Sequence, residues 1–280
     1  MALLAALATI AVLATITAMA SRGARSSAAV VHNARADAVA RAMAESGVLA
    51  AVDRIEGVLG AARDSAQRQA AFDALLAAPR IGTGNGNGNG DAPFVQDSLD
   101  DGVFAVALVN VSARFDVNSG DVEGLTRLFG TVAPAAEAAA AAARVQLRLR
   151  RLPGQRTASD SLRAVRDSIA AAMLGRTSAP DAAGRFDSLD ELAEWLGADA
   201  PWLPKVAEYL TVDGDGNIDR RHAPPPVLRA ASGSLVESPT RVLVIARGWD
   251  RQTPLTREIQ AVYAVNGDRL ALVHWREQRR

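Results

Sequence analysis

The sequence predicts an α+β fold, in which a long N-terminal helix packs on a small antiparallel sheet that carries a large inserted helical domain. Three observations predict it: an uncharged apolar opening that continues into helical periodicity, a run of hairpin-forming strands at the C-terminal end, and a helix-rich middle. The chain has 280 residues, of which 49% are hydrophobic, so it can bury a substantial core.

Composition excludes several classes of function. The chain has 31 basic and 31 acidic residues, so its zero net charge argues against a general affinity for nucleic acid. It has no cysteine, which excludes disulfides, thiolate metal sites and cysteine nucleophiles.

The opening stretch, Met1 to Ala20, contains no charged residue. At about 1.5 Å per residue a helix of this length spans roughly 30 Å, the thickness of the hydrocarbon core of a bilayer. We therefore predict a transmembrane helix over residues 1–20. The alternative is a cleaved secretory signal ending at Ala18-Met19-Ala20, which has the small-x-small pattern of a cleavage site but lacks the usual preceding basic residues.

Residues 21–78 continue the helix with an amphipathic pattern, and we expect it to end near Ala78 because Pro79 follows. Residues 79–101 include GTGNGNGNG, which predicts a flexible loop; the strictly alternating glycines do not fit the dinucleotide-binding pattern G-x-G-x-x-G. The apolar stripe of the amphipathic part consists of Val48, Val52, Ile55, Leu59, Ala62 and Ala66.

The sheet is predicted from two separated segments, residues 102–118 and 234–280. β-branched residues predict a strand from Gly102 to Arg114. Near the C-terminal end, Arg241 to Arg247 and Arg257 to Val265 read as strands, and Asn266-Gly267 predicts a hairpin turn before a returning strand, Leu270 to Trp275. Such a meander needs a partner, which the first strand and the long helix can supply.

Residues 119–233 form the predicted helical insertion. Asn118 or Ser119 can cap a short first helix that contains Leu125 and Leu128. An alanine-rich helix follows from Pro134 to about Arg151, and another begins at Ser161.

The second half of the insertion has a well-specified helix start. Ser188 and Glu191 form a capping box, in which each side chain bonds the other residue's backbone amide. A short helix is expected from Pro201 to Tyr209, and Pro224 to Pro226 pre-set the start of the last one.

The sequence contains no recognisable catalytic constellation. His32, His222 and His274 are far apart and have no companion at metal-ligand spacing, and neither a nucleophile elbow nor a P-loop occurs. We therefore expect a structural protein rather than an enzyme, with no catalytic and no cofactor-binding residues.

Asp213, Asp215 and Asn217 are the only weak candidates for a metal site, because alternate oxygen-bearing side chains in a turn can converge on calcium. The pattern departs from an EF-hand at Ile218, where glycine is required, and at Pro224, where the closing glutamate belongs. An ordinary Asx-rich turn is the preferred interpretation, and no cofactor is expected beyond a weak possibility of calcium.

Four stretches, in this order, resemble the general secretion pathway protein K family, the large minor pseudopilin of type II secretion systems. They are MALLAALATIAVLA, ARADAVARAMAESGVLAAVDRI, ARFDVNSGDVEGLTRLF and FDSLDELAEWLGADAPWLPKVAEYLTVDGDGNIDRRHAPPPVLRA with the meander ending in VHWRE. Ala5 stands where other pilins have a glutamate, and K-type members typically lack that glutamate as well.

The resemblance implies a non-enzymatic subunit at the tip of a periplasmic pseudopilus, which initiates assembly and supports export across the outer membrane. Its partners would be the I-type and J-type minor pseudopilins, the major pseudopilin, the inner-membrane assembly platform and the lipid bilayer, with no nucleic acid. It would be a single-pass inner-membrane protein with its C-terminal domain in the periplasm.

The sequence departs from the family in three places. One is the middle segment from Thr131 to Arg185, which lacks the family's aspartate- and tryptophan-containing stretch. The short basic leader is missing, so we expect Met1 to be either the mature first residue or a misassigned start. Asp219 and Arg221 stand where the family usually carries asparagines, so the calcium sites of the family are not carried over.

Two alternatives remain open. SLDELAEWLGADAPWLPKVAEYL resembles the two helices of a helix-hairpin-helix nucleic-acid-binding motif, although Ala198 to Trp202 replace its glycine-rich hairpin. The other alternative is a secreted periplasmic protein whose signal peptide is cleaved.

Overall fold

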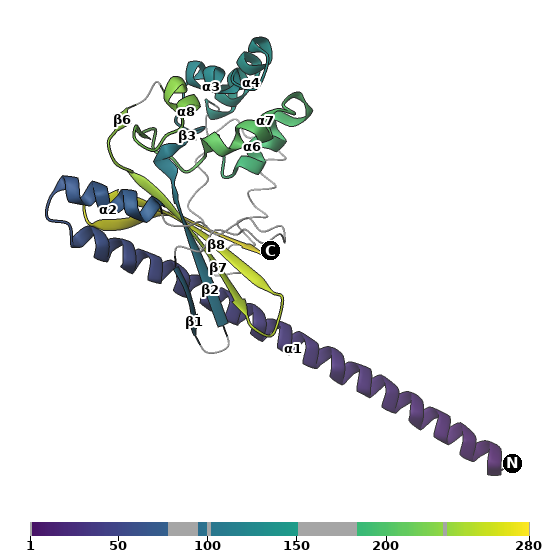
Figure 1. Ribbon diagram of the computed structural model, residues 1–280. Coiled ribbons are helices and arrows are strands. Elements are labelled where there is room, and N and C mark those ends of the chain that lie inside the picture. The colour runs from purple at the N-terminus through teal and green to yellow at the C-terminus, as the bar shows by residue number, and fades with distance from the viewer. Residues whose placement is uncertain (1, 78–94, 100–101, 151–183, 232–233, 280) are drawn as a thin grey trace.

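The computed structural model describes residues 2–77, 95–99, 102–150, 184–231 and 234–279. A long helix, α1 (Ala2–Gly60), crosses one face of a five-stranded sheet. Figure 1 shows the N-terminal end of α1 extending away from the sheet, while the helices of the insertion gather at the other end. The predicted α+β fold class is confirmed.

The main sheet is antiparallel throughout, with the strand order β1-β2-β7-β8-β9. The predicted meander is confirmed, and its first strand, β7, pairs with every residue of β2. The strands are β1 (Val95–Leu99), β2 (Gly102–Asn110), β7 (Arg241–Asp250), β8 (Thr256–Asn266) and β9 (Arg269–Arg279).

Two details of the sheet correct the sequence prediction. Strand β1 lies inside the predicted loop 79–101; three of its five residues, Gln96 to Ser98, are polar, so its sequence gives no strand pattern and its pairing comes from β2. Asn266 pairs with Arg269, so the hairpin turn consists of Gly267 and Asp268, one residue later than predicted. Gly267 has φ +68°, a backbone conformation that favours glycine.

Helix α1 packs on the sheet through small residues. Ala40, Ala44 and Ala51 are fully buried, and a Cβ added to Gly248 of β7 would overlap the backbone of Ala40 and Ala44. The helix backbone therefore lies directly on the strand at this point. Large residues, including Ile55, take over further along the helix.

The helix predicted to run to Ala78 is broken. α1 ends at Gly60, and α2 (Ser65–Ala77) begins after a turn in which the Asp64 carboxylate accepts a hydrogen bond from the Gln67 amide at 2.7 Å. α2 buries Phe72 and Leu75 in the core that α1 and the sheet share. Ala66, expected on the apolar stripe, is exposed because the break turns it away.

The helical insertion leaves the sheet after β2 and returns before β7. Two small parallel strand pairs, β3 (Phe115–Asp116) with β4 (Leu210–Thr211) and β5 (Ile218–Asp219) with β6 (Leu235–Val236), connect it to the sheet. Its helices are η1 (Val111–Ala113), α3 (Val122–Phe129), α4 (Ala135–Leu149), α6 (Leu189–Leu196), η2 (Gly197–Asp199), α7 (Leu203–Val206), η3 (Ala207–Tyr209) and α8 (Pro225–Ala230).

Two caps differ from the prediction. α3 is capped by Asp121, whose carboxylate accepts from the Gly124 amide, rather than by Asn118 or Ser119. The Ser188 hydroxyl accepts from the Glu191 amide at 3.1 Å as predicted, but the Glu191 carboxylate bonds the amide of Asp187. The predicted helix from Ser161 and most of the predicted Gly/Asn loop lie outside the described residues.

Candidate functional site

The acidic turn singled out from the sequence lies between β4 and β5, at the base of the insertion. The Asp215 carboxylate accepts from the Asn217 amide at 3.1 Å, and Gly216 has φ +85°. This is the Asx turn that the sequence predicted. The turn is anchored at its start by the Asp213 amide, which donates to the Thr211 hydroxyl at 3.2 Å.

Both carboxylates of the turn face arginines of the sheet. Arg276 of β9 donates to the Asp213 carboxylate, and Arg241 of β7 donates to the carbonyl oxygens of Asp213 and Gly214 at 2.7 Å each. The Arg241 Nε also lies 3.9 Å from the carboxylate of Asp215. Two fixed guanidinium groups therefore meet the oxygens that a cation would use.

The calcium prediction for Asp213, Asp215 and Asn217 rests on this turn. Among the residues that the structure describes, no group of three or more histidine, cysteine, aspartate or glutamate side chains is arranged to hold a metal ion. The positive charges of Arg241 and Arg276 disfavour the binding of a metal cation at this position, because like charges repel. Calcium binding stays a prediction.

Two titratable groups next to the turn have shifted pKa values. Burial raises the pKa of the Asp116 carboxyl, and hydrogen bonds from the Ser119 hydroxyl and the Asn118 amide oppose this shift. Burial also lowers the pKa of His274 on β9, and the neighbouring Arg276 lowers it further. Both shifts come from enclosure between the insertion and the sheet.

A second polar cluster joins the insertion to α2. Asp219 is fully buried, and its carboxylate accepts from Asn110 Nδ2 at 2.8 Å and from the Arg221 amide at 3.0 Å. His222 Nδ1 lies 2.7 Å from the same carboxylate, while Arg221 donates to Asp73 of α2 at 2.8 Å. Asp219 and Arg221 stand out in the sequence only as departures from a family pattern. Their partners Asn110 and Asp73 lie too far along the chain to be found from spacing.

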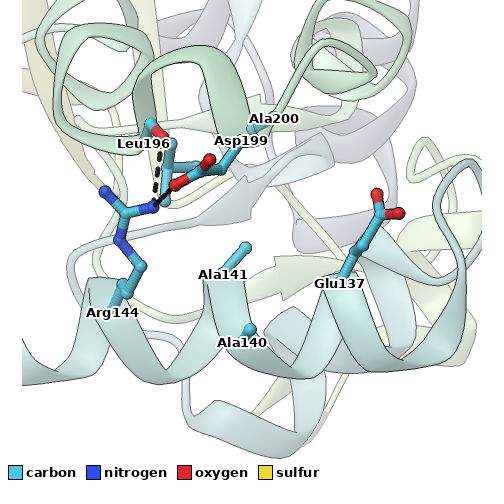
Figure 2. A pocket seen from close by; sticks show the side chains of 7 residues that line it. All are labelled: Glu137, Ala140, Ala141, Arg144, Leu196, Asp199 and Ala200. Carbon is cyan, nitrogen blue, oxygen red and sulfur yellow. Dashed lines mark hydrogen bonds and ion pairs between the residues drawn. The ribbon is translucent and has the colours of Figure 1, made fainter.

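Figure 2 shows a shallow hollow between α4 and the α6–η2 segment. Its volume is about 190 Å³, below the roughly 300 Å³ at which ordinary ligand pockets begin. Arg144 at its edge already donates to the Asp199 carboxylate at 2.7 Å and to the Trp195 carbonyl at 2.9 Å. Arg144 and Asp199 are thus paired with each other, and Glu137 is the other charged side chain that lines the hollow. It is lined by Glu137, Ala140, Ala141, Arg144, Leu196, Asp199 and Ala200.

The described side chains in the first part of α1 are exposed. Ala36 is the first buried residue of the chain among those described, and residues 27–35 are all exposed. Val30 and Val31 are apolar residues in this free part, with about two-thirds of their surface exposed (67% and 69%). An exposed apolar helix of this kind is a surface for other apolar partners.

The transmembrane prediction for residues 1–20 falls mostly on side chains outside the described set. Within the residues that the structure describes, no helix is both long and apolar enough to cross a membrane.

A charged clamp holds α1 where it leaves the sheet. Arg257 of β8 donates two hydrogen bonds of 2.6 Å to the carboxylate of Asp37. Glu277 of β9 lies 3.7 Å from both Arg257 and Arg41. Sequence reasoning missed this clamp because Asp37 and Arg257 are 220 residues apart and neither belongs to a motif.

The pair of helices that resembles a helix-hairpin-helix is packed into the insertion. Ala200 and Trp202, in the connection between α6 and α7, are buried, and the Trp202 ring lies 5.0 Å from the Phe129 ring. In a helix-hairpin-helix this connection must reach phosphate groups, whereas here its side chains are part of a core.

Comparisons with known proteins give a distant likeness to a solved structure. No known protein family matches this sequence, and no curated protein matches it. A chain in the crystal structure of the GspK-GspI-GspJ complex from the type 2 secretion system of enterotoxigenic Escherichia coli is similar over 66% of this chain and 82% of that chain. The identity is 14% and the TM-score 0.44, a level at which the likeness does not extend to function.

Proposed function

We propose that this chain is a minor pseudopilin of a type II secretion system, of the general secretion pathway protein K type, with a structural and non-enzymatic role. The observation that carries the proposal is the arrangement of α1: its second half packs on the sheet from Ala36 onward, while the side chains of residues 27–35 are exposed and the N-terminal end of the helix extends away from the sheet. A subunit that joins a bundle of neighbouring helices needs such a helix: one part packs on its own domain, and the other part is exposed to the neighbouring subunits. The four stretches of sequence resemblance support the same assignment.

The free part of α1 has the composition that such a role requires. Residues 2–20 contain only apolar residues and threonine, many of them alanine. Small residues allow helices to approach closely, and leucine and isoleucine are compatible with lipid. In this proposal the helix anchors the subunit in the inner membrane, with the folded domain in the periplasm, until the helix is taken up by the filament.

The two ends of the molecule differ, which fits a position at the filament tip. α1 leaves the sheet beside Gly248 and Arg257, whereas the insertion joins it at Asn110 and Arg241, the opposite ends of β2 and β7. A bulky body opposite the assembly helix would leave no room for another subunit above it. The subunit would therefore begin the filament, in contact with the I-type and J-type minor pseudopilins.

Co-purification from membranes tests the proposal directly. The full chain, tagged at its C-terminal end, is co-expressed with I-type and J-type pseudopilins of a type II secretion system. We expect a stoichiometric complex of the three after detergent extraction. A chain that remains monomeric with both partners folded would contradict the proposal.

N-terminal sequencing of the protein from membranes separates the proposal from the cleaved-signal alternative. A retained helix from Met1, with a methylated residue in it, supports a pseudopilin. A start at Ser21 would contradict it, because the assembly helix would then be absent from the mature protein.

A further inference from the structure

The insertion and the sheet have separate hydrophobic cores. The core of the insertion is built around residues such as Phe129, Leu192 and Trp202, and the core under α1 around residues such as Ile55 and Phe72. Among the described residues, no buried side chain belongs to both cores. A small third cluster, Val111, Leu243 and Val262, lies on the face of the sheet opposite α1.

The two chain crossings between these bodies meet at one point. The Ser112 hydroxyl lies 2.9 Å from the Thr240 hydroxyl, and it accepts from the Thr240 and Arg241 amides at 3.1 and 3.0 Å. Close by, the Asn110 side chain donates to the buried carboxylate of Asp219. Because the two connections between the sheet and the insertion are short and lie side by side, the insertion can rotate about them as about a hinge.

Beside this pivot, charged groups hold the insertion against the sheet, in addition to the Arg221–Asp73 pair that joins it to α2. Arg276 donates to the Asp213 carboxylate and the Asp187 carbonyl, and Arg241 donates to the Asp213 and Gly214 carbonyls. We name Arg241, Arg276 and Asp213 the arginine catch. The side chains of Arg276 and Asp213 are only 18% and 11% exposed, so their ion pair is shielded from water.

We propose that the helical insertion is a hinged body whose orientation on the sheet is set by the arginine catch. When the catch is weakened, the insertion turns about the Ser112–Thr240 crossing while both cores stay folded. Polar interfaces between bodies with separate cores permit such motion, since little apolar surface is exposed by it. The inference does not depend on the proposed function.

A distance measurement between two spin labels tests the hinge. The natural chain has no cysteine, so Glu194→Cys on α6 and Ala271→Cys on β9, both exposed, give two unique labelling sites. In the full chain we expect one narrow distance distribution by double electron–electron resonance. Adding Arg241→Gln and Arg276→Gln should broaden it or add a second population.

The control variant is Arg127→Gln, which removes an exposed ion pair with Glu123 inside the insertion. It should leave the distribution narrow; broadening in this control would overturn the proposal, because the insertion itself would then be loose. Near-ultraviolet circular dichroism checks that each variant keeps its packed cores.

Asp213→Asn provides a milder test that keeps the size of the side chain, should the double arginine variant fail to fold. It weakens the pair with Arg276 and should also broaden the distribution. If the distance distribution stays as narrow as that of the parent in every folded catch variant, contacts other than the catch fix the orientation of the insertion and the proposal is wrong.

Discussion

Gly248 is the residue at which the long helix lies closest to the sheet. An alanine there would place its Cβ on the backbone of Ala40 and Ala44, so α1 would have to move outward. We expect Gly248→Ala to lower the free energy of unfolding by about 1–3 kcal/mol, the usual cost of overpacking. Urea-induced unfolding followed by circular dichroism measures the change.

Gly57 of α1 is the matched control for this substitution. A Cβ at Gly57 meets no atom within 4 Å, so Gly57→Ala should stabilise the helix by about 0.5–1 kcal/mol. Equal effects of the two substitutions would mean that the close helix–strand approach does not limit stability.

His274 is predicted to make the fold sensitive to acid. Its pKa in the folded state lies below its ordinary value of 6.5, because burial and Arg276 disfavour the charged form. The unfolded chain therefore binds more protons just below this pH. The stability contributed by neutral His274 is fully present above pH 6.5 and is lost as the pH falls from 6.5 through the lower pKa of the folded state.

Replacing His274 by glutamine should flatten the dependence of unfolding free energy on pH between about 5 and 7.5. His32→Gln is the control, because His32 is exposed on the free part of α1. Urea midpoints measured across this range decide the question: parallel curves for His274→Gln and the parent would contradict the predicted role of His274.

At the scale of elements, the predictions that succeeded rest on local pattern. The alternation in β8, the alanine-rich α4 and the prolines at the start of α8 are visible in short windows of sequence. The predictions that were wrong concern elements fixed by distant partners. β1 is a strand because β2 pairs with it. α1 ends at Gly60 because α2 folds back into the same core. The arginines that meet the acidic turn were missed for the same reason.

The start of α3 tests whether a capping residue close in sequence fixes where a helix begins. The Asp121 carboxylate accepts a hydrogen bond of 2.6 Å from the Gly124 amide. We expect Asp121→Ala to lower the unfolding free energy by about 1 kcal/mol, as other caps do, while Asp121→Asn should cost less because its amide oxygen can still accept. Thermal unfolding of the two variants makes the comparison; no loss with alanine would mean that the tertiary contacts of α3 alone fix its start.

At the scale of the whole molecule, the long helix divides into a part that stabilises the fold and a part that does not. Residues 27–35 are exposed, whereas Ala36, Ala40, Met43 and Ala44 are buried against the sheet. The sequence showed a continuous helical pattern over both parts. It could not show where the sheet begins to cover the helix, since that boundary is set by strands more than 200 residues later in the chain.

Two truncations separate these parts. A chain that starts at residue 27 should keep the thermal midpoint of the full chain, because every described buried residue remains; it should fail to float with lipid vesicles and fail to co-purify with other pseudopilins. A chain that starts at residue 45 should lose several kcal/mol of stability, because the burial of Ala36, Ala40, Met43 and Ala44 is lost along with the Asp37–Arg257 clamp. If the chain starting at residue 27 still binds both vesicles and partners, the free part of α1 is not the assembly element and the proposed function loses its structural basis.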